Sequence, residues 1–117
     1  MPQDLAALPF CYLTTTGRVT GNAHRIEIWF ALDGDVAYLM AGDRERSDWV
    51  RNLMIKPHVV LELGEERRVT EARVVDPGSD QDALARRLLL EKYRGENDNL
   101  SEWGRTALPV AVAWPAP

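Results

Sequence analysis

Residues 12–30 read YLTTTGRVTGNAHRIEIWF, and this stretch decides the fold that we expect for the chain. It starts as a strand rich in β-forming residues, breaks after Thr16 at a tip that contains two glycines, and returns as a second strand at residues 24–32. No acidic residue lies between Leu5 and Ile26, although the whole chain carries a net charge of -4. The stretch therefore predicts a hairpin whose tip can hold an anion, with a phosphate as the first candidate.

The hairpin tip supplies the first group of candidate ligand-binding residues. Hydroxyls and the exposed amides beside glycines suit phosphate oxygens, and an arginine adds a two-pronged donor. The alternative is a solvated turn with two surface arginines, which the pattern alone does not exclude. The candidates in this group are Arg18, Thr20, Gly21, His24 and Arg25.

The second group lies at the start of a helix predicted for residues 47–55, which Ser47 caps and Pro57 ends. A helix N-terminus presents free amides and a partial positive charge, so it also favours anions. Trp49 and Asn52 lie one turn apart on one helix face. An amide is unusual beside a core-facing tryptophan, so Asn52 either caps a backbone carbonyl or reaches a ligand. These three residues are candidates for the site, and a purely structural role is the alternative.

Trp29 is the third candidate. Alternation along the second strand places Trp29 with Arg25 and Glu27, on the face opposite Ile26 and Ile28. An aromatic ring among charges suits stacking against a flat ligand. The same ring could equally cover an end of the barrel or contact a second copy of the chain.

The rest of the chain adds further strands and a second helix. Asp33-Gly34 is a tight-turn signal, and the almost wholly apolar run VAYLMA at residues 36–41 indicates a strand buried on both faces. Strands are expected at residues 11–15, 24–32, 35–41, 58–63, 67–75 and 108–114, and helices at residues 47–55 and 79–93. The order β-β-β-α-β-β-α-β predicts a mainly β protein with two helices, whose six strands close into a barrel because closure removes exposed edges.

Length and composition limit the class of protein. A chain of 117 residues predicts a single domain spanning residues 1–117. The acidic net charge argues against a nucleic-acid partner, and no apolar window is long enough to predict a membrane span. Cys11 is the one cysteine, so no internal disulfide is possible and a cytoplasmic setting is expected.

The sequence predicts no catalytic side chain and no metal site. His24 and His58 fall on different predicted elements, and Cys11 has no partner cysteine. Neither a nucleophile elbow nor a phosphate-loop motif is present, and no acid/base pair stands out. We therefore expect the protein to bind a cofactor that performs the reaction.

The order of motifs resembles a known family. The sequence contains T-T-T-G-R-x-S/T-G, a strand ending in an aromatic residue, Asp-Gly, an apolar strand and then W-x-x-N-L-x-x-x-P before a valine-rich strand. This combination resembles the deazaflavin-dependent nitroreductase family, one of the flavin/deazaflavin split-barrel oxidoreductases that also include pyridoxamine-phosphate-oxidase-like proteins. The likeness covers residues 12–75, and the final strand also matches.

The resemblance implies a split β-barrel and an oxidoreductase activity. The expected cofactor is the reduced deazaflavin coenzyme F-420, which delivers a hydride to a quinone, a nitro compound or another unsaturated small molecule. Family motifs carry over to Arg18, Thr20, Gly21 and His24 as the phosphate grip, to Trp49 and Asn52 as the groove lining, and to Trp29 as the substrate-facing aromatic residue. The chain departs from the family pattern at Val19, His24 and Glu27.

Several alternatives stay open at this point. FMN could replace the deazaflavin, because it also brings a phosphate and a flat ring. A non-catalytic protein that stores or senses a flavin, a haem or another flat ligand is a second function class, and a structural dimer-forming barrel is a third. A homodimer is plausible, with Trp103 and Trp114 as candidate contacts because they fall in segments expected outside the barrel core.

Overall fold

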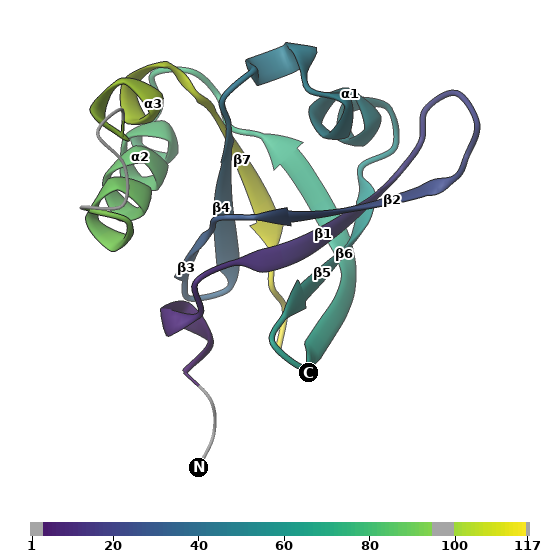
Figure 1. Ribbon diagram of the computed structural model, residues 1–117, viewed down its shortest axis with the longest axis horizontal. Coiled ribbons are helices and arrows are strands. Elements are labelled where there is room, and N and C mark those ends of the chain that lie inside the picture. Colours follow the sequence, from purple (N-terminus) through teal and green to yellow (C-terminus); the bar gives the residue numbers. More distant parts are fainter. Residues whose placement is uncertain (1–3, 95–99, 117) are drawn as a thin grey trace.

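The computed structural model describes residues 4–94 and 100–116, and these form a mainly β fold with three α-helices. Seven strands in this described part make one curled antiparallel half-barrel in the order β2-β1-β5-β6-β7-β4-β3 (Figure 1). The strands are β1 (Cys11–Thr16), β2 (Ala23–Ile28), β3 (Ala31–Asp33), β4 (Val36–Ala41), β5 (His58–Leu63), β6 (Glu66–Val74) and β7 (Leu108–Ala113). The helices are α1 (Asp48–Ile55), α2 (Asp80–Lys92) and α3 (Leu100–Thr106), with short 3-10 helices at Leu5–Ala7 and Arg44–Arg46. No helix of the described residues is long and apolar enough to cross a membrane.

The predicted count of six strands and two helices is wrong, and so is the predicted element order. The differences arise in two segments of the chain. The stretch 24–32 is two strands, because β2 pairs with β1, with Cys11 opposite Ile28, whereas β3 pairs with β4, with Ala31 opposite Tyr38. In addition, α3 forms a third helix in a segment expected to be mostly loop. The described elements therefore follow the order β-β-β-β-α-β-β-α-α-β.

Phe30 explains why the alternation concealed this break. Its side chain is fully buried in the barrel core, so the apolar pattern continues through residue 30. Its backbone bonds to a helix instead of a strand: the Phe30 N–H donates to the Tyr93 hydroxyl at 3.0 Å, and the Phe30 carbonyl accepts from Lys92 Nζ at 2.8 Å. The Tyr93 hydroxyl lies 2.9 Å from the Pro9 carbonyl, to which it donates. The end of α2 thus takes the place of a neighbouring strand.

β4 separates two apolar layers, as its continuous hydrophobic run predicted. Leu39 points into the barrel interior, whereas Tyr38 and Met40 pack in a second cluster with Leu89 of α2. Figure 1 shows α2 and α3 side by side against the outside of the sheet, while α1 lies at one end of the barrel. The barrel core and the helix layer therefore share β4 as their common wall.

Two tryptophans expected outside the core are engaged within the chain. Trp114 is 7% exposed and belongs to the barrel core, with the Arg68 guanidinium 4.6 Å from its ring centroid. Trp103 is half-buried and packs against the helix-side cluster. The expectation that both segments lie outside the core is wrong for Trp114, so this ring is not available as a dimer contact.

α3 is fastened to the rest of the fold through its backbone carbonyls. Arg86 on α2 donates from Nη1 to the Gly104 carbonyl at 2.9 Å. Arg44, from the 3-10 helix before α1, donates from Nη1 to the Thr106 carbonyl at 2.6 Å. Cations at the last carbonyls of a helix also favour its dipole. These contacts fix the helix that carries Trp103.

Removing the Tyr93 hydroxyl should destabilise the fold. Tyr93→Phe leaves the buried N–H of Phe30 without its acceptor, which should lower the free energy of unfolding by about 1–3 kcal/mol. Tyr12→Phe is the matched control, because its hydroxyl bonds the exposed Glu27 carboxylate and its loss should cost less than about 1 kcal/mol. Urea unfolding followed by circular dichroism measures both changes. Equal losses in the two variants would contradict the role given to Tyr93.

Candidate active site

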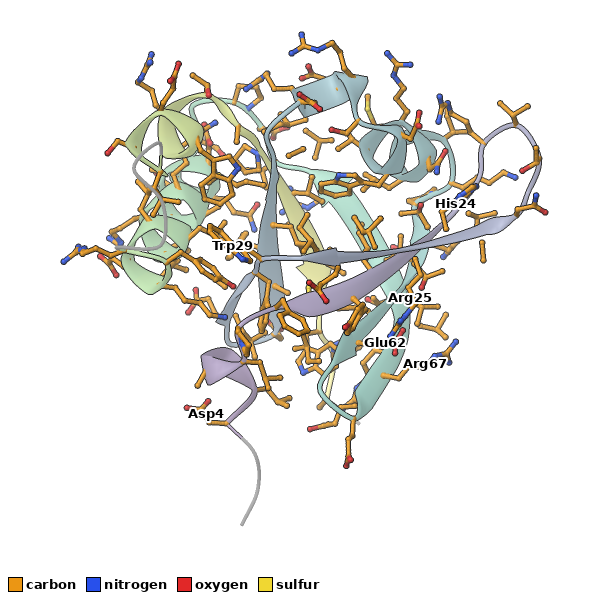
Figure 2. All side chains as sticks on the ribbon, in the orientation of Figure 1. Asp4, His24, Arg25, Trp29, Glu62 and Arg67 are labelled. Carbon is orange, nitrogen blue, oxygen red and sulfur yellow. The ribbon has the colours of Figure 1, made fainter. Side chains whose placement is uncertain are left out.

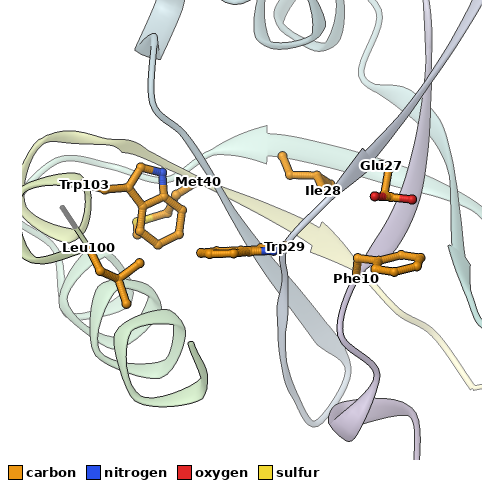
Figure 3. A pocket seen from close by; sticks show the side chains of 7 residues that line it. All are labelled: Phe10, Glu27, Ile28, Trp29, Met40, Leu100 and Trp103. Atoms are coloured by element: carbon orange, nitrogen blue, oxygen red, sulfur yellow. The ribbon is translucent and has the colours of Figure 1, made fainter. Parts of the chain in front are cut away.

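Two cavities lie along β2, one at each end of the strand. The tip cavity, of about 390 Å³, lies between the β1–β2 hairpin tip and α1. It is lined by Gly17, Arg18, Val19, Thr20, His24, Ile26, Asp48, Trp49 and Asn52. The Trp29 cavity, of about 480 Å³, is shown in Figure 3. It is lined by Phe10, Glu27, Ile28, Trp29, Met40, Leu100 and Trp103.

The predicted site residues divide between these cavities and the surrounding surface. Five of them line the tip cavity, namely Arg18, Thr20, His24, Trp49 and Asn52. Trp29 lines the second cavity. Gly21, Arg25 and Ser47 line neither cavity. The structure thus brings the hairpin tip and the W-x-x-N helix together, as the resemblance implied.

The hairpin tip is a defined turn held by its own backbone. The Gly17 N–H donates to the Asn22 carbonyl at 2.7 Å, and the Gly21 N–H donates to the Gly17 carbonyl at 2.9 Å. Gly21 has a φ of 79°, in the left-handed region that favours glycine. The Thr20 hydroxyl accepts from the Asn22 N–H at 3.3 Å. Gly21 therefore shapes the turn, although its position is outside the cavity lining.

Asn52 joins the hairpin to α1. It is 4% exposed, and its Oδ1 accepts from the Arg18 backbone N–H at 3.1 Å and from Arg18 Nη1 at 2.8 Å. Its Nδ2 donates to the Thr15 hydroxyl at 3.2 Å. Every polar atom of the amide is therefore used in holding the hairpin. The unusual amide beside Trp49 has a structural explanation that also places Arg18 in the cavity.

Arg18 carries the main positive charge of the tip cavity, and part of it is balanced by a neighbour. Arg18 Nη2 lies 3.3 Å from Asp48 Oδ1, and the Arg18 side chain keeps 28% of its surface exposed. Lys56 Nζ donates to the Gly17 carbonyl at 3.3 Å. Sequence reasoning missed Asp48 and Lys56, because neither has a local signal for a contact with the distant hairpin.

Arg25 points away from the tip cavity. Its Nε donates to Glu62 Oε1 at 3.0 Å and its Nη2 to Glu62 Oε2 at 3.3 Å, while the guanidinium lies 3.8 Å from the Tyr12 ring centroid. The hydrogen bond from Arg25 lowers the pKa of Glu62. Successive residues of a strand face opposite sides, so His24 enters the cavity and Arg25 does not. Figure 2 shows Arg25 beside Glu62, whereas His24 lies closer to the hairpin tip.

Ser47 is the residue before α1, as expected, but its side chain makes no capping hydrogen bond. It lies outside the residues that line either cavity. The first turn of α1 instead carries Asp48, whose carboxylate meets Arg18. An acidic residue at this point opposes the anion site that the free helix amides suggested.

Trp29 is held by two other aromatic rings. The Trp29 and Tyr93 rings stack in parallel, with centroids 4.2 Å apart and an interplanar angle of 3°. Trp103 meets Trp29 edge-on, at 5.8 Å and 87°. Figure 3 shows the Trp29 ring between Trp103 and Leu100 on one side and Phe10 and Glu27 on the other. Tyr93 thus covers one face of the Trp29 ring, and the residue lines the cavity.

Two of the chemistries considered from the sequence can be examined in the structure, a metal centre and a cysteine nucleophile. They contain no cluster of three or more side chains able to hold a metal ion. Cys11 is buried, and burial raises the pKa of its thiol to about 12, so the thiol stays protonated. The tip cavity combines basic and polar side chains with the apolar Ile26 and Trp49, and the Trp29 cavity is mainly aromatic and apolar.

Comparison with known proteins identifies a family to which the sequence is similar. The model of the F420H(2)-dependent quinone reductase family matches residues 2–115. An F420H(2)-dependent quinone reductase of Mycobacterium tuberculosis (strain H37Rv) is 28% identical over 109 residues, which cover 91% of this chain and 72% of that protein.

Solved structures show the same fold. An F420-H2 dependent reductase (FDR-A) superimposes with a TM-score of 0.73 at 20% identity, over 90% of this chain and 93% of that one. HutZ, the heme storage protein of Vibrio cholerae, superimposes with a TM-score of 0.73 at 13% identity, over 93% of this chain and 83% of that one.

The pyridoxamine-phosphate-oxidase-like fold is therefore confirmed, and the match of the family model over nearly the whole chain leaves no need for the FMN alternative. The chain belongs to the F420H(2)-dependent quinone reductase family, whose members are oxidoreductases that depend on reduced coenzyme F-420.

Proposed function

We propose that this chain reduces a quinone or a related flat acceptor in the Trp29 cavity, with the phosphate of reduced coenzyme F-420 held in the tip cavity. The observation that carries the proposal is that both cavities border one strand, β2. His24 and Ile26 reach the first cavity, and Ile28 and Trp29 reach the second. A coenzyme whose phosphate lies in the tip cavity could therefore extend along β2 toward an acceptor in the Trp29 cavity.

The side chains of the tip cavity fit a phosphate. Arg18 offers a partly exposed guanidinium, and His24 and Thr20 add an imidazole and a hydroxyl at the same cavity. Nothing lies within 4 Å of a Cβ built on Gly21, so an anion can approach the turn backbone from outside. Because Asn52 already fixes Arg18, the binding of an anion does not have to order that side chain.

Asp48 must be accommodated in this arrangement. Its carboxylate is paired with Arg18, and its side chain is 85% exposed. Surface ion pairs of this kind contribute little, roughly 0–1 kcal/mol, so a phosphate that makes charge-assisted hydrogen bonds can replace Asp48 as the partner of Arg18. The pair lowers the net positive charge of the cavity without blocking it.

Trp49 and Ile26 form the apolar wall of the tip cavity. Both side chains are half-buried and pack against the barrel core. This wall excludes water from one side of a flat ring and strengthens electrostatic interactions within the groove. When bound, reduced coenzyme F-420 supplies the hydride, so the protein needs to position the two partners rather than provide a nucleophile.

Trp29 positions the acceptor. Its stack on Tyr93 holds the indole in one orientation, and a flat acceptor can lie against the remaining face. A quinone that takes up a hydride and a proton becomes the hydroquinone, so two electrons and two protons enter each turnover. Nitro compounds are flat acceptors of the same kind and belong to this proposal.

A homodimer and a cytoplasmic location stay predictions. One structure with a TM-score of 0.73 and 20% identity is described as a domain-swapped dimer, and a likeness at that identity shows the fold alone. Light scattering of the purified chain at several concentrations would measure its oligomeric state directly.

Arg18 and Arg25 make a matched pair for testing the phosphate end. Arg18→Ala should weaken the binding of coenzyme F-420 by about tenfold or more, because charge-assisted hydrogen bonds are worth about 1.5–3 kcal/mol. Arg25→Ala should change the dissociation constant less than about twofold, because Arg25 bonds Glu62 outside the cavity. Calorimetry without an acceptor gives both constants, and unfolding curves check that each variant folds. A larger loss for Arg25→Ala would contradict the assignment.

Trp29 tests the acceptor end. Trp29→Ala should raise the KM for a naphthoquinone by about tenfold, because stacking and burial of one aromatic ring contribute on the order of 1.4 kcal/mol. The dissociation constant of the coenzyme should change far less, and Trp29→Phe should recover part of the loss. Steady-state kinetics and calorimetry separate the two parameters. If Trp29→Ala weakened coenzyme binding but left the KM for the quinone unchanged, Trp29 would contact the coenzyme and not the acceptor.

A further inference from the structure

The Trp29 cavity contains one charged side chain among the described residues that line it. Its other lining residues are aromatic or apolar, and the exception is Glu27. A neutral quinone has only oxygen acceptors at its polar edge, and a carboxylate offers these no hydrogen-bond donor. We propose that this cavity selects flat acceptors that carry a positive charge, and that Glu27 determines this preference. The inference rests on the proposed function, because it concerns the acceptor end of the same site.

The charge of Glu27 has no ionic partner among the described residues. Its Oε1 accepts from the Tyr12 hydroxyl at 3.0 Å, and this hydrogen bond raises the pKa of Tyr12. Arg25 lies two residues before Glu27 on the same face of β2, but its guanidinium is bonded to both oxygens of Glu62 and lies over the Tyr12 ring. Figure 3 shows the Glu27 carboxylate next to Phe10, at the end of the cavity opposite Trp103. The carboxylate can therefore interact with a ligand without first breaking an ion pair.

The aromatic rings around Glu27 favour the same ligands. A cation within about 6 Å of an aromatic centroid is attracted by the negative face of the ring, and tryptophan is the strongest partner. Trp29 lines the cavity with one face stacked on Tyr93, and Figure 3 shows Trp103 and Phe10 on either side of it. A flat cation stacked on Trp29 would then carry its positive charge in the cavity that the Glu27 carboxylate also lines. A neutral ring of equal size would gain the stacking alone.

The structure also explains how this preference can persist in an open site. The Tyr12 hydroxyl donates to one oxygen of Glu27, which favours one position of the carboxylate on the strand. Tyr12 itself is held between Phe10, with centroids 5.6 Å apart, and the Arg25 guanidinium. The position of the charge is therefore set by packing on the outer face of the sheet and does not depend on the ligand.

Equilibrium binding tests the inference without turnover. The probes are N-methylquinolinium, a flat cation, and quinoline, a neutral ring of nearly the same size, each titrated into the full chain at pH 7.5 and followed by the indole NMR signals. The wild-type chain should bind the cation about fivefold more tightly than the neutral ring, and added salt should reduce the difference. Glu27→Gln should remove most of this preference. Asp33→Asn is the control, because it removes one negative charge at the exposed β3–β4 turn, away from the cavity.

Turnover provides an independent measure. With reduced coenzyme F-420, Glu27→Gln should lower kcat/KM for a naphthoquinone bearing a trimethylammonium group about fivefold more than for 2-methyl-1,4-naphthoquinone. Equal effects of Glu27→Gln on both quinones, or no preference for the cation in the wild-type chain, would overturn the inference while leaving the proposed function intact. Cation binding without any oxidation of the coenzyme would support the inference and count against the proposed function.

Discussion

The hydrogen bonds that Tyr93 and Lys92 make to the backbone of Phe30 replace a neighbouring strand where the chain leaves β2. A buried amide without a partner is costly, so the chain can turn at this point only because α2 ends beside it. Lys92 contributes despite its own burial, which lowers its pKa from 10.5 to about 8, and its ammonium lies 3.6 Å from the Phe30 ring centroid. The orientation of Trp29, on the stacked ring of Tyr93, follows from the same contact.

Much of the fold could be predicted from local pattern. The hairpin, the double-sided burial of β4 and the helix that starts after Ser47 all have signals within a few residues. The break between β2 and β3 at Trp29 and Phe30 has no such local signal. The Phe30 side chain continues the two-residue apolar period, while the backbone changes its pairing partner. α3 was missed because it is only seven residues long and depends on contacts from α2 and from the loop before α1.

In the candidate site, too, features with a local sequence signal were predicted, and contacts between residues far apart in the chain were not. Charge counting found the basic hairpin and treated Arg18 and Arg25 alike. Alternation placed Arg25 on the face opposite Ile26, but its pairing with the distant Glu62 has no signal within the hairpin. Asn52 stood out as an amide beside a tryptophan, yet its partners on the hairpin lie 34 and 37 residues away. An acidic residue in the first turn of a helix is stabilised by the helix dipole, which explains Asp48 without any partner. Nothing in the sequence therefore indicated that Asp48 pairs with Arg18.

β2 is anchored at both ends, since Asn52 ties the hairpin before it to α1 and Tyr93 ties the residue after Trp29 to α2. Its six residues form about 20 Å of extended chain, so the strand sets the separation between the tip cavity and the Trp29 cavity. A one-residue deletion within β2 would shorten the strand and would also move every later side chain of the strand to the opposite face of the sheet. Substitutions in β2 can therefore change which side chains line the two cavities, whereas a change in its length would disturb the contacts at both of its ends.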